Sequence, residues 1–374
     1  MLRLRTLVII VVPALAALFA LHVQINLGGA QKFLRELTGA ERGELVVGFL
    51  PVTCHLTCPV TNWVTAHSER GSLFRSKKYT EFATIAEELR QGKLQATFIL
   101  APLAMALRRA GAPIKIVYLG HRDGTTLVVH RDSDIQTFGD LKGRTVAIPH
   151  NYSNQRILLA REMEKHGMQP ADMHLVVYPP PEMPSALQKR AVDAYIVGEP
   201  MAAKSEIDGF GRVLAFTKDL WPNFISCVLV VREELIRDNR PLVQELVDGI
   251  AASGKWIDAP GEDLTDGVQR AGTAPIDDPA VAVLPDGWNA SHRMQAAAIA
   301  ARQEYYHQDS ELLRFVLSKP PDRVRYTDLI PARHDLEEIQ RYAEQLGYFE
   351  PSAPGDAFGF DDYCDTTFAN RAAP

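Results

Sequence analysis

The sequence predicts an α/β protein of two related lobes, each a mostly parallel sheet flanked by helices, with a ligand cleft between the lobes. Apolar runs of strand length alternate with stretches of helical periodicity, which is typical of parallel sheets. The chain has 374 residues, more than one hydrophobic core normally organises. Strands that stop at proline also come in two equally spaced pairs, Pro51 with Pro102 and Pro149 with Pro200.

The most complete copy of the repeated unit spans residues 176–200. It reads as a strand, a turn fixed by prolines, a short helix and a buried strand that stops at Gly198 and Glu199. Residues 89–102 repeat its second half, but this copy ends in Leu-Ala where the later one ends in Gly-Glu. Two such copies predict lobes that face each other, with an acid on the wall of the second lobe only.

In the first lobe, residues 44–50 form a continuous apolar run, which predicts a strand buried on both faces and ended by Pro51. Residues 80–90 place Phe82, Ile85 and Leu89 on one helical face. Similar patterns predict strands at 96–100 and 114–118, and a helix at 102–109 with proline in its first turn.

The polar, glycine-containing residues 120–126 predict the first crossing between the lobes. In the second lobe, Thr137 and Asp140 have the spacing of a capping box. The predicted strands of this lobe are 126–130, 145–148, 175–178, 194–197 and 213–216, with a helix at 156–166. The apolar residues 226–231 return the chain to the first lobe. Helices are predicted at 241–257, 291–306, 310–317 and 335–346, with long loops at 258–287.

The N-terminus reads as an export segment. Arg3 and Arg5 precede an apolar run at residues 7–23, the arrangement found in signal peptides. The run has about the minimum length of a membrane span. We therefore predict that residues 1–24 are a signal peptide or an uncleaved inner-membrane anchor, which would provide membrane contact. The remainder would then be periplasmic or otherwise extracytoplasmic.

These features give the predicted domain organisation. After residues 1–24, a linker covers 25–43, the first part of lobe 1 covers 44–123, and lobe 2 covers 124–224. Lobe 1 resumes at 225–350 with the return strand and the C-terminal helices, and 351–374 form a tail that wraps over the surface. The net charge of −6, without a sustained basic stretch, predicts no nucleic-acid partner.

The four cysteines are Cys54, Cys58, Cys227 and Cys364, a number that permits disulfides in an exported protein. Cys54, His55 and Cys58 place two thiols and an imidazole within five residues. They could bind a soft metal, form a local disulfide or remain plain thiols, and the sequence leaves these alternatives open. No resident cofactor is predicted, although a Ca²⁺ or soft-metal co-ligand stays open.

Several motifs resemble the nitrate/sulfonate/bicarbonate (NitT/TauT-type) family of ABC-transporter periplasmic substrate-binding proteins, which includes thiamine-precursor binders. The motifs that carry the resemblance are Asp140-Leu-Lys-Gly143, Pro180-Pro181, Met183, Ala186-Leu187, Val192-Asp193-Ala194 and Glu199-Pro200. The resemblance implies a two-lobe periplasmic binding protein fold of the type II-like class. Arg190 departs from the family pattern, which has glycine there. If this position is left-handed, arginine costs about 1 kcal/mol.

Parallel sheets bind ligands beyond the carboxyl ends of their strands, so the strand ends of both lobes should meet at one cleft. The candidate ligand-binding residues are Thr53, His55, Asn62, Ala101, Pro102, His121, Asp123, His150, Tyr152, Ser153, Asn154, Gln155, Tyr178, Glu182, Gly198 and Glu199. Helix N-termini at this cleft would offer neutral hydrogen-bond donors, which suit a small oxyanion or a polar solute. Glu199 either contacts the ligand, protonated or bridged by a cation, or pairs with Arg122 or Arg156 as a closure latch.

The resemblance implies a solute-binding protein that captures a small anion or polar solute by hinge closure and delivers it to ABC permease subunits. The sequence contains neither a phosphate-binding loop nor a dinucleotide-binding motif, and no catalytic residue is predicted. Two alternatives stay open. One is a protein on the same fold that binds or synthesises a thiamine-precursor pyrimidine with a metal at Cys54, His55 and Cys58. The other is a membrane-anchored solute sensor.

Overall fold

The computed structural model describes residues 45–66, 71–259, 292–302, 305–349 and 358–372, together with Leu18 and Phe19. Residues 45–374 form one unit, separate from residues 1–44. Apart from Leu18 and Phe19, the predicted export segment and linker lie outside the described residues, as does most of the predicted loop region 258–287. Within the described part of the chain, no helix is both long and apolar enough to cross a membrane.

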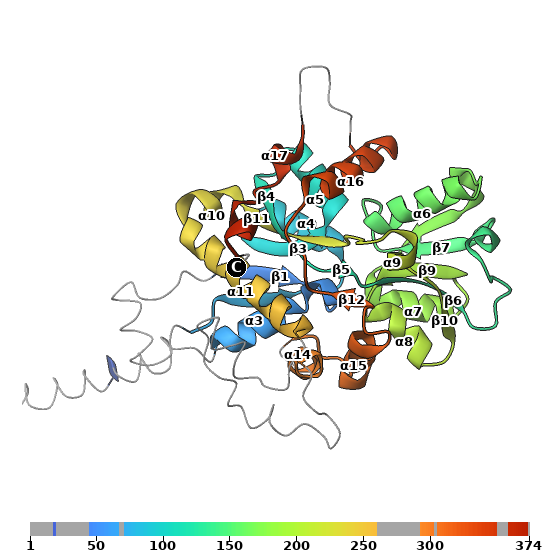
Figure 1. Cartoon of the computed structure of the whole chain (residues 1–374), viewed down its shortest axis with the longest axis horizontal. Coiled ribbons are helices and arrows are strands. Elements are labelled where there is room, and N and C mark those ends of the chain that lie inside the picture. Colours follow the sequence, from blue (N-terminus) through green and yellow to red (C-terminus); the bar gives the residue numbers. More distant parts are fainter. Residues whose placement is uncertain are drawn as a thin grey trace, which may run out of the picture. The chain divides into compact units, whose positions relative to one another are not determined.

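Two five-stranded sheets organise the unit (Figure 1). The first contains, in spatial order, β2 (Phe74–Lys78), β1 (Leu45–Phe49), β3 (Ala96–Leu100), β11 (Cys227–Arg232) and β4 (Ile114–Leu119). The second contains β8 (His174–Val177), β7 (Thr145–Ile148), β9 (Ala194–Gly198), β6 (Thr125–His130) and β10 (Gly211–Phe216). The two orders correspond position by position, so the internal repeat predicted from the proline spacing is confirmed.

Each sheet is mixed in direction. Four strands run one way, and the fifth, β11 in the first sheet and β6 in the second, runs against its neighbours. These reversed strands are the ones on which the chain has just crossed from one sheet to the other. The predicted α/β fold class is confirmed. A third, two-stranded sheet joins β5 (Arg122–Asp123) to β12 (Val324–Arg325) at the crossing.

Helices cover both sheets (Figure 1). Those between the strands of the first sheet are α3 (Thr57–Ala66), α4 (Phe82–Arg90) and α5 (Ala101–Arg109). Those of the second are α6 (Asn154–Lys165), α7 (Met183–Gln188), α8 (Met201–Ile207) and α9 (Thr217–Leu220). After the return come α10 (Glu233–Asp238), α11 (Arg240–Asp258), α14 (His292–Ala301), α15 (Ser310–Ser318) and α16 (Arg333–Gln345). Helix α16 packs on α5 and α6, and α15 packs on α8, so the C-terminal helices span the two lobes.

Local signals explain most of these elements, and β2 is the one strand of the two main sheets that they did not indicate. Ser153 caps α6 by accepting a hydrogen bond from the Arg156 amide at 3.2 Å, and the capping box of Thr137 and Asp140 is present. Strand β2 was missed because its sequence, FRSKK, has no apolar run. It is an edge strand that pairs only with β1, and most of its side chains are partly or fully exposed. Its sequence therefore has no hydrophobic pattern typical of a buried strand.

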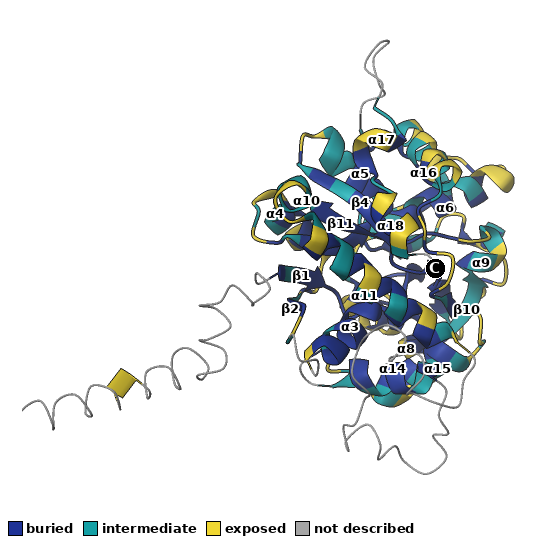
Figure 2. Cartoon of the chain, turned by 60° about the vertical axis from the view of Figure 1, so that its left-hand side comes forward, coloured by how far each residue is buried: buried dark blue, intermediate teal, exposed yellow. Residues whose placement is uncertain are grey.

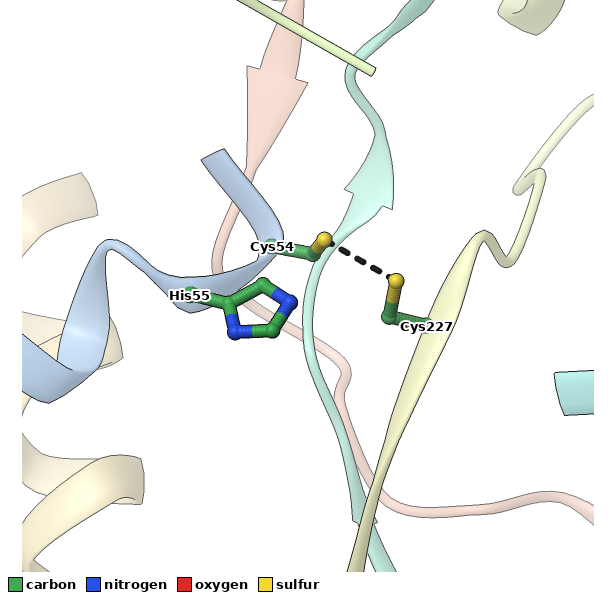
Figure 3. A group of neighbouring side chains, drawn as sticks. All are labelled: Cys54, His55 and Cys227. Atoms are coloured by element: carbon green, nitrogen blue, oxygen red, sulfur yellow. Dashed lines mark hydrogen bonds between the residues drawn. The ribbon is translucent and has the colours of Figure 1, made fainter. Parts of the chain in front are cut away.

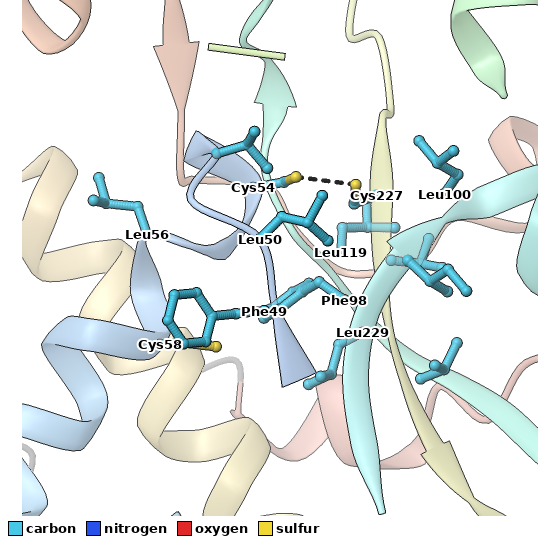
Figure 4. Close-up of a cluster of buried hydrophobic side chains, with 14 of the residues drawn as sticks. Phe49, Leu50, Cys54, Leu56, Cys58, Phe98, Leu100, Leu119, Cys227 and Leu229 are labelled. Atoms are coloured by element: carbon cyan, nitrogen blue, oxygen red, sulfur yellow. Dashed lines mark hydrogen bonds between the residues drawn. The ribbon is translucent and has the colours of Figure 1, made fainter. Parts of the chain in front are cut away.

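Buried residues concentrate on the strands and on the inner faces of the helices (Figure 2). The larger hydrophobic cluster surrounds the first sheet, where Phe49, Leu50 and Phe98 are fully or almost fully buried (Figure 4). A smaller cluster, which includes Leu127 and Ile196, packs against the second sheet. The larger cluster also takes in residues of the second lobe, so the two lobes share part of one core.

The described end of the tail is more ordered than the sequence indicated. Residues 358–372 include α17 (Phe360–Tyr363) and α18 (Thr367–Ala372), and α18 packs on α11 and β4. Phe360, Tyr363 and Phe368 are buried. This part of the tail packs on the first lobe as two short helices with buried aromatic residues, an order that the low periodicity of the sequence did not indicate.

Arg190 occupies the left-handed region, with φ of 55°, so Arg190→Gly should raise the free energy of unfolding by about 1 kcal/mol. The lost ion pair with Asp132 contributes little, because both side chains are exposed and the charges lie 3.8 Å apart. Urea denaturation of the two proteins measures the difference. Lys189→Gly is the matched control, since Lys189 has φ of −79° and should gain nothing. An Arg190→Gly protein no more stable than the wild type would contradict the expectation.

Candidate functional site

A small cavity lies between the two sheets, at the carboxyl ends of their strands. The first lobe lines it with Val52, Cys54, Phe82 and Ser226, and the second with Pro149, Gln155, Pro180, Val197 and Gly198. Its volume of about 10 Å³ is close to what one water molecule requires. None of these nine residues is charged. The cavity is therefore a neutral chamber in the position where α/β sheets bind ligands.

The lobes are closed on each other around this cavity by direct hydrogen bonds. Gln155 Nε2 donates to Ser226 Oγ at 3.1 Å, and the side-chain amide of Asn154 donates to the carbonyl of Ile225. The Thr53 amide donates to the carbonyl of Glu199 at 2.6 Å. Because each bond joins one lobe to the other, opening the cleft would break all of them.

The first turn of α6 provides the polar wall of the second lobe. Ser153 ends the extended segment after β7 and caps the helix. Ser153, Asn154 and Gln155 are all buried there. Among the described residues, Asn154 Oδ1 and Gln155 Oε1 have no hydrogen-bond partner. A buried amide oxygen without a partner costs free energy. Both side chains therefore have unused hydrogen-bonding capacity beside the cavity.

Glu199 does not line the cavity, although its strand does. Its Oε1 accepts hydrogen bonds from Thr126 Oγ1 and Arg323 Nε, both at 2.7 Å, and its Oε2 accepts one from the Ala203 amide at 2.9 Å. The acid that the sequence placed on the cleft wall is thus neutralised by an arginine from the C-terminal segment. The prediction that Glu199 pairs with Arg122 or Arg156 is wrong, because its partner is Arg323. Arg122 instead pairs with Asp335 at 2.7 Å.

Two histidines lie buried behind the cavity wall. The Leu50 amide donates to His55 Nδ1 at 3.2 Å, and His121 Nε2 lies 3.3 Å from Thr53 Oγ1. Burial lowers the pKa of His55 to about 3, with a further contribution from His121, and burial lowers the pKa of His121 to about 4. Both rings are therefore neutral at neutral pH and contribute no charge to the site.

The cysteine cluster differs from the one that the sequence spacing suggested. Cys54 and His55 lie in the turn after β1, and the Cys54 sulfur lies 3.0 Å from the sulfur of Cys227 on β11 (Figure 3). One ring nitrogen of His55 lies within 4.8 Å of both sulfurs. Cys58 is instead buried in α3 within the larger hydrophobic cluster (Figure 4). In the described residues, Cys54, His55 and Cys58 do not form a ligand set, because Cys58 lies beyond the turn.

The other sequence candidates are distributed around the cleft without lining its cavity. Ala101 and Pro102 are buried at the start of α5, and the Ala101 amide donates to the carbonyl of Ser226 at 3.2 Å. Asp123 pairs with Arg325 at 3.0 Å, and Asn62 lies on α3, 3.5 Å from the Tyr305 hydroxyl. The partly or fully exposed candidates are His150, Tyr152, Tyr178 and Glu182.

Only two of the nine residues that line the cavity, Gln155 and Gly198, were among the ligand-binding candidates. The reasons for the misses differ from residue to residue. Phe82 follows the end of β2, so it was overlooked together with that strand. Ser226 stands directly before the apolar return strand, and the rule that ligands bind at the points where the chain crosses between lobes could have identified it. Arg323 gave no local signal, since its partner Glu199 is 124 residues away.

Comparisons with known proteins agree with this geometry. A family model described as the NMT1-like family matches residues 38–266. The nitrate import ATP-binding protein NrtC of Synechocystis is 25% identical over 254 residues, which cover 62% of this chain and 38% of that protein. The taurine-binding periplasmic protein of Escherichia coli is 26% identical over 183 residues, which cover 48% of this chain and 56% of that protein.

The chain thus spans less than two thirds of the length of these curated relatives. Among solved structures, the periplasmic nitrate-binding protein NrtA from Synechocystis superposes with a TM-score of 0.71, at 15% identity and 88% coverage of both chains. At this identity the likeness concerns the fold alone. It places the present two-lobe arrangement among the folds of periplasmic binding proteins.

Proposed function

The chain belongs to the NMT1-like family, and from this premise we propose that it is the solute-binding component of an ABC importer. It would capture a small anion or polar solute in the cleft between its lobes. The observation that carries the proposal is the neutral cavity at the carboxyl ends of both sheets, closed by hydrogen bonds between the lobes. The names of the relatives point the same way, since they include a nitrate importer component and a taurine-binding protein.

The geometry suggests how binding would proceed. The lobes are joined by crossing segments near Gly120–Thr125 and Ile225, so a hinge motion there separates them without disrupting either sheet. Opening frees Asn154, Gln155 and Ser226 from their bonds across the cleft. A solute with suitable donors or acceptors replaces those bonds, enlarges the cavity to its own size and shifts the population towards the closed form.

The cavity wall would bind the solute through neutral hydrogen-bonding groups and a helix N-terminus, without a charged side chain. The N-terminus of α6 favours an oxyanion through its unpaired amides and partial positive charge. The amides of Asn154 and Gln155 can each present a donor or an acceptor. Because Glu199 is paired with Arg323, it does not repel an anion in the cavity. Nitrate, bicarbonate and sulfonate-like solutes all fit this description.

Delivery of the solute to ABC permease subunits, and a periplasmic or extracytoplasmic location with or without an anchor at residues 7–23, are parts of the same proposal. The relatives are components of import systems or periplasmic binding proteins by name. The enzymatic alternative relied on a metal at Cys54, His55 and Cys58, a set that the fold does not assemble. No observation in the described residues favours the sensor alternative.

A thermal-shift screen of the purified protein tests the proposal. The solutes are nitrate, bicarbonate, short alkanesulfonates, cyanate and pyrimidines, each with and without Ca²⁺. One solute class should raise the melting temperature in a saturable manner, because it binds the folded state only. If no compound stabilises the protein at millimolar concentration, the solute-binding proposal fails.

Gln155→Leu should weaken binding of the solute found in that screen by about tenfold, the effect of losing a hydrogen bond at a buried polar site. Isothermal titration measures the two dissociation constants. Gln188→Leu, on the exposed face of α7, is the matched control and should bind as the wild type does. Equal affinities in the Gln155→Leu and Gln188→Leu proteins would place the solute elsewhere.

A further inference from the structure

The sulfurs of Cys54 and Cys227 are brought together from distant parts of the chain. They lie 3.0 Å apart although the residues are 173 positions apart in the chain. This separation is about 1 Å longer than the bond of a disulfide. Both side chains are buried, Cys54 at 2% exposure and Cys227 at 0%. Such proximity across the chain is not a consequence of local spacing, so it reflects how the fold packs these two segments.

The surrounding backbone holds the two segments close. Gly120 lies between them, and a β-carbon at this position would be 2.9 Å from the Cys54 carbonyl and 3.2 Å from the Cys227 carbonyl. The Gly120 amide also donates to the Cys227 carbonyl at 2.9 Å. The turn that follows β1, the crossing after β4 and the start of β11 therefore meet at one point, and the thiol pair lies at that point.

His55 is a poor partner for a metal held by these sulfurs. Its Nδ1 accepts the Leu50 amide hydrogen, so the neutral ring must carry its own proton on Nε2. Neither nitrogen then offers a free lone pair to a metal. The sulfurs are also too close, since two thiolates on a tetrahedral zinc lie about 3.8 Å apart. Among the described residues, His55 Nε2 has no hydrogen-bond partner.

We propose that Cys54 and Cys227 form a reversible disulfide that joins the turn after β1 to strand β11. The oxidant is a disulfide of the glutathione or thiol-oxidase class. One thiolate attacks it and forms a mixed disulfide, and the second thiolate displaces the oxidant's sulfur. The S–S bond of the oxidant and the two S–H bonds of the cysteines are broken, and one S–S bond between Cys54 and Cys227 and two S–H bonds on the oxidant are formed. The two electrons reduce the oxidant, which leaves as two thiols with the two protons.

This disulfide would lie at the wall of the cavity. Cys54 lines the cavity, and Cys227 directly follows Ser226, which also lines it. A bond between them fixes two parts of the first lobe's wall against each other, while the second lobe remains free to move. It also closes a loop of more than 170 residues, which restricts the unfolded chain. The oxidised protein should therefore be more stable than the reduced one.

Mass spectrometry of the full chain tests the proposal directly. The protein is incubated with glutathione disulfide or with dithiothreitol, unfolded, alkylated and digested. The oxidised sample should have two free thiols in place of four, a mass about 2 Da lower before alkylation, and one linked peptide pair containing Cys54 and Cys227. Four free thiols after oxidation, or a link from Cys54 to Cys58, would overturn it. Stoichiometric zinc retained by the reduced protein would overturn it as well.

Variants give an independent readout. Oxidation should raise the melting temperature of the wild type by about 3–8 °C. The same rise is expected in Cys364→Ser, which removes a buried thiol outside the pair, and no rise is expected in Cys227→Ser. A rise that persists in Cys227→Ser would contradict the proposal. If Cys227→Ser does not fold, peptide mapping of the wild type decides alone. Neither measurement depends on solute binding, so this proposal and the transport proposal can fail separately.

Discussion

Replacing Arg323 with methionine is expected to lower the free energy of unfolding by about 3–5 kcal/mol, because it leaves a buried carboxylate without its counter-ion. The side chains of Arg323 and Glu199 are 1% and 0% exposed, and Arg323 Nε lies 2.7 Å from Glu199 Oε1. The guanidinium also lies near Glu206 at 3.4 Å and donates to the carbonyl of Lys319 at 3.0 Å. Arg323 thus connects the C-terminal segment to the second lobe.

Urea denaturation of wild type and Arg323→Met measures this effect. The matched control is Arg333→Met, whose partner Asp361 is 81% exposed, and it should change stability by less than about 1 kcal/mol. Adding Glu199→Gln to Arg323→Met should recover part of the loss, since the neutral amide can stay buried without a counter-ion and still accept the Ala203 amide hydrogen. Equal losses in Arg323→Met and Arg333→Met would refute the importance of the buried pair.

Mild acid is expected to destabilise the protein strongly, because His55 and His121 must stay neutral in the folded state. Their folded pKa values, about 3 and about 4, lie below the ordinary histidine value of 6.5. Between pH 6.5 and pH 4 the unfolded chain therefore binds protons that the folded chain does not, so stability falls as the pH falls. From pH 7 to pH 5 the two rings together should lower the free energy of unfolding by about 4 kcal/mol.

The measurement is a series of denaturant titrations between pH 7.5 and pH 4.5. The slope of the unfolding free energy against pH over this range measures how many more protons the unfolded chain binds than the folded one. This number should fall by about one in His55→Gln and by about one in His121→Gln. His334→Gln, which removes an exposed histidine, is the control and should leave the slope unchanged. An unchanged slope in both buried-histidine variants would show that these rings do not cause the acid sensitivity.

The fold was largely predictable because its signals are local. Continuous apolar runs located nine of the ten strands in the two main sheets, and proline spacing indicated that the two sheets are copies. The resemblance to nitrate and sulfonate binders is confirmed by the family match and by the relatives. Edge strand β2 was missed because its side chains are partly exposed and show no hydrophobic alternation. The helices within residues 358–372 were missed because their apolar residues are irregularly spaced.

The candidate site was predictable only in outline. The rule that ligands bind at carboxyl ends of strands placed Gln155 and Gly198 on the list, and both line the cavity. The same rule could not separate side chains that point into the cavity from those bonded behind it, such as His121. Side-chain direction at a strand end depends on the turn that follows, which the sequence pattern does not specify.

The sequence by itself determined the two α/β copies, their strand ends and the cap of α6, since each depends on residues a few positions apart. The tertiary structure alone decided the partners of the polar groups. Glu199 meets Arg323, and Cys54 meets Cys227 rather than Cys58. These pairs are more than 100 residues apart in the sequence, and only the packing of the folded chain brings them together. A buried charge or thiol takes the partner that the fold places beside it, whatever lies nearest in the sequence.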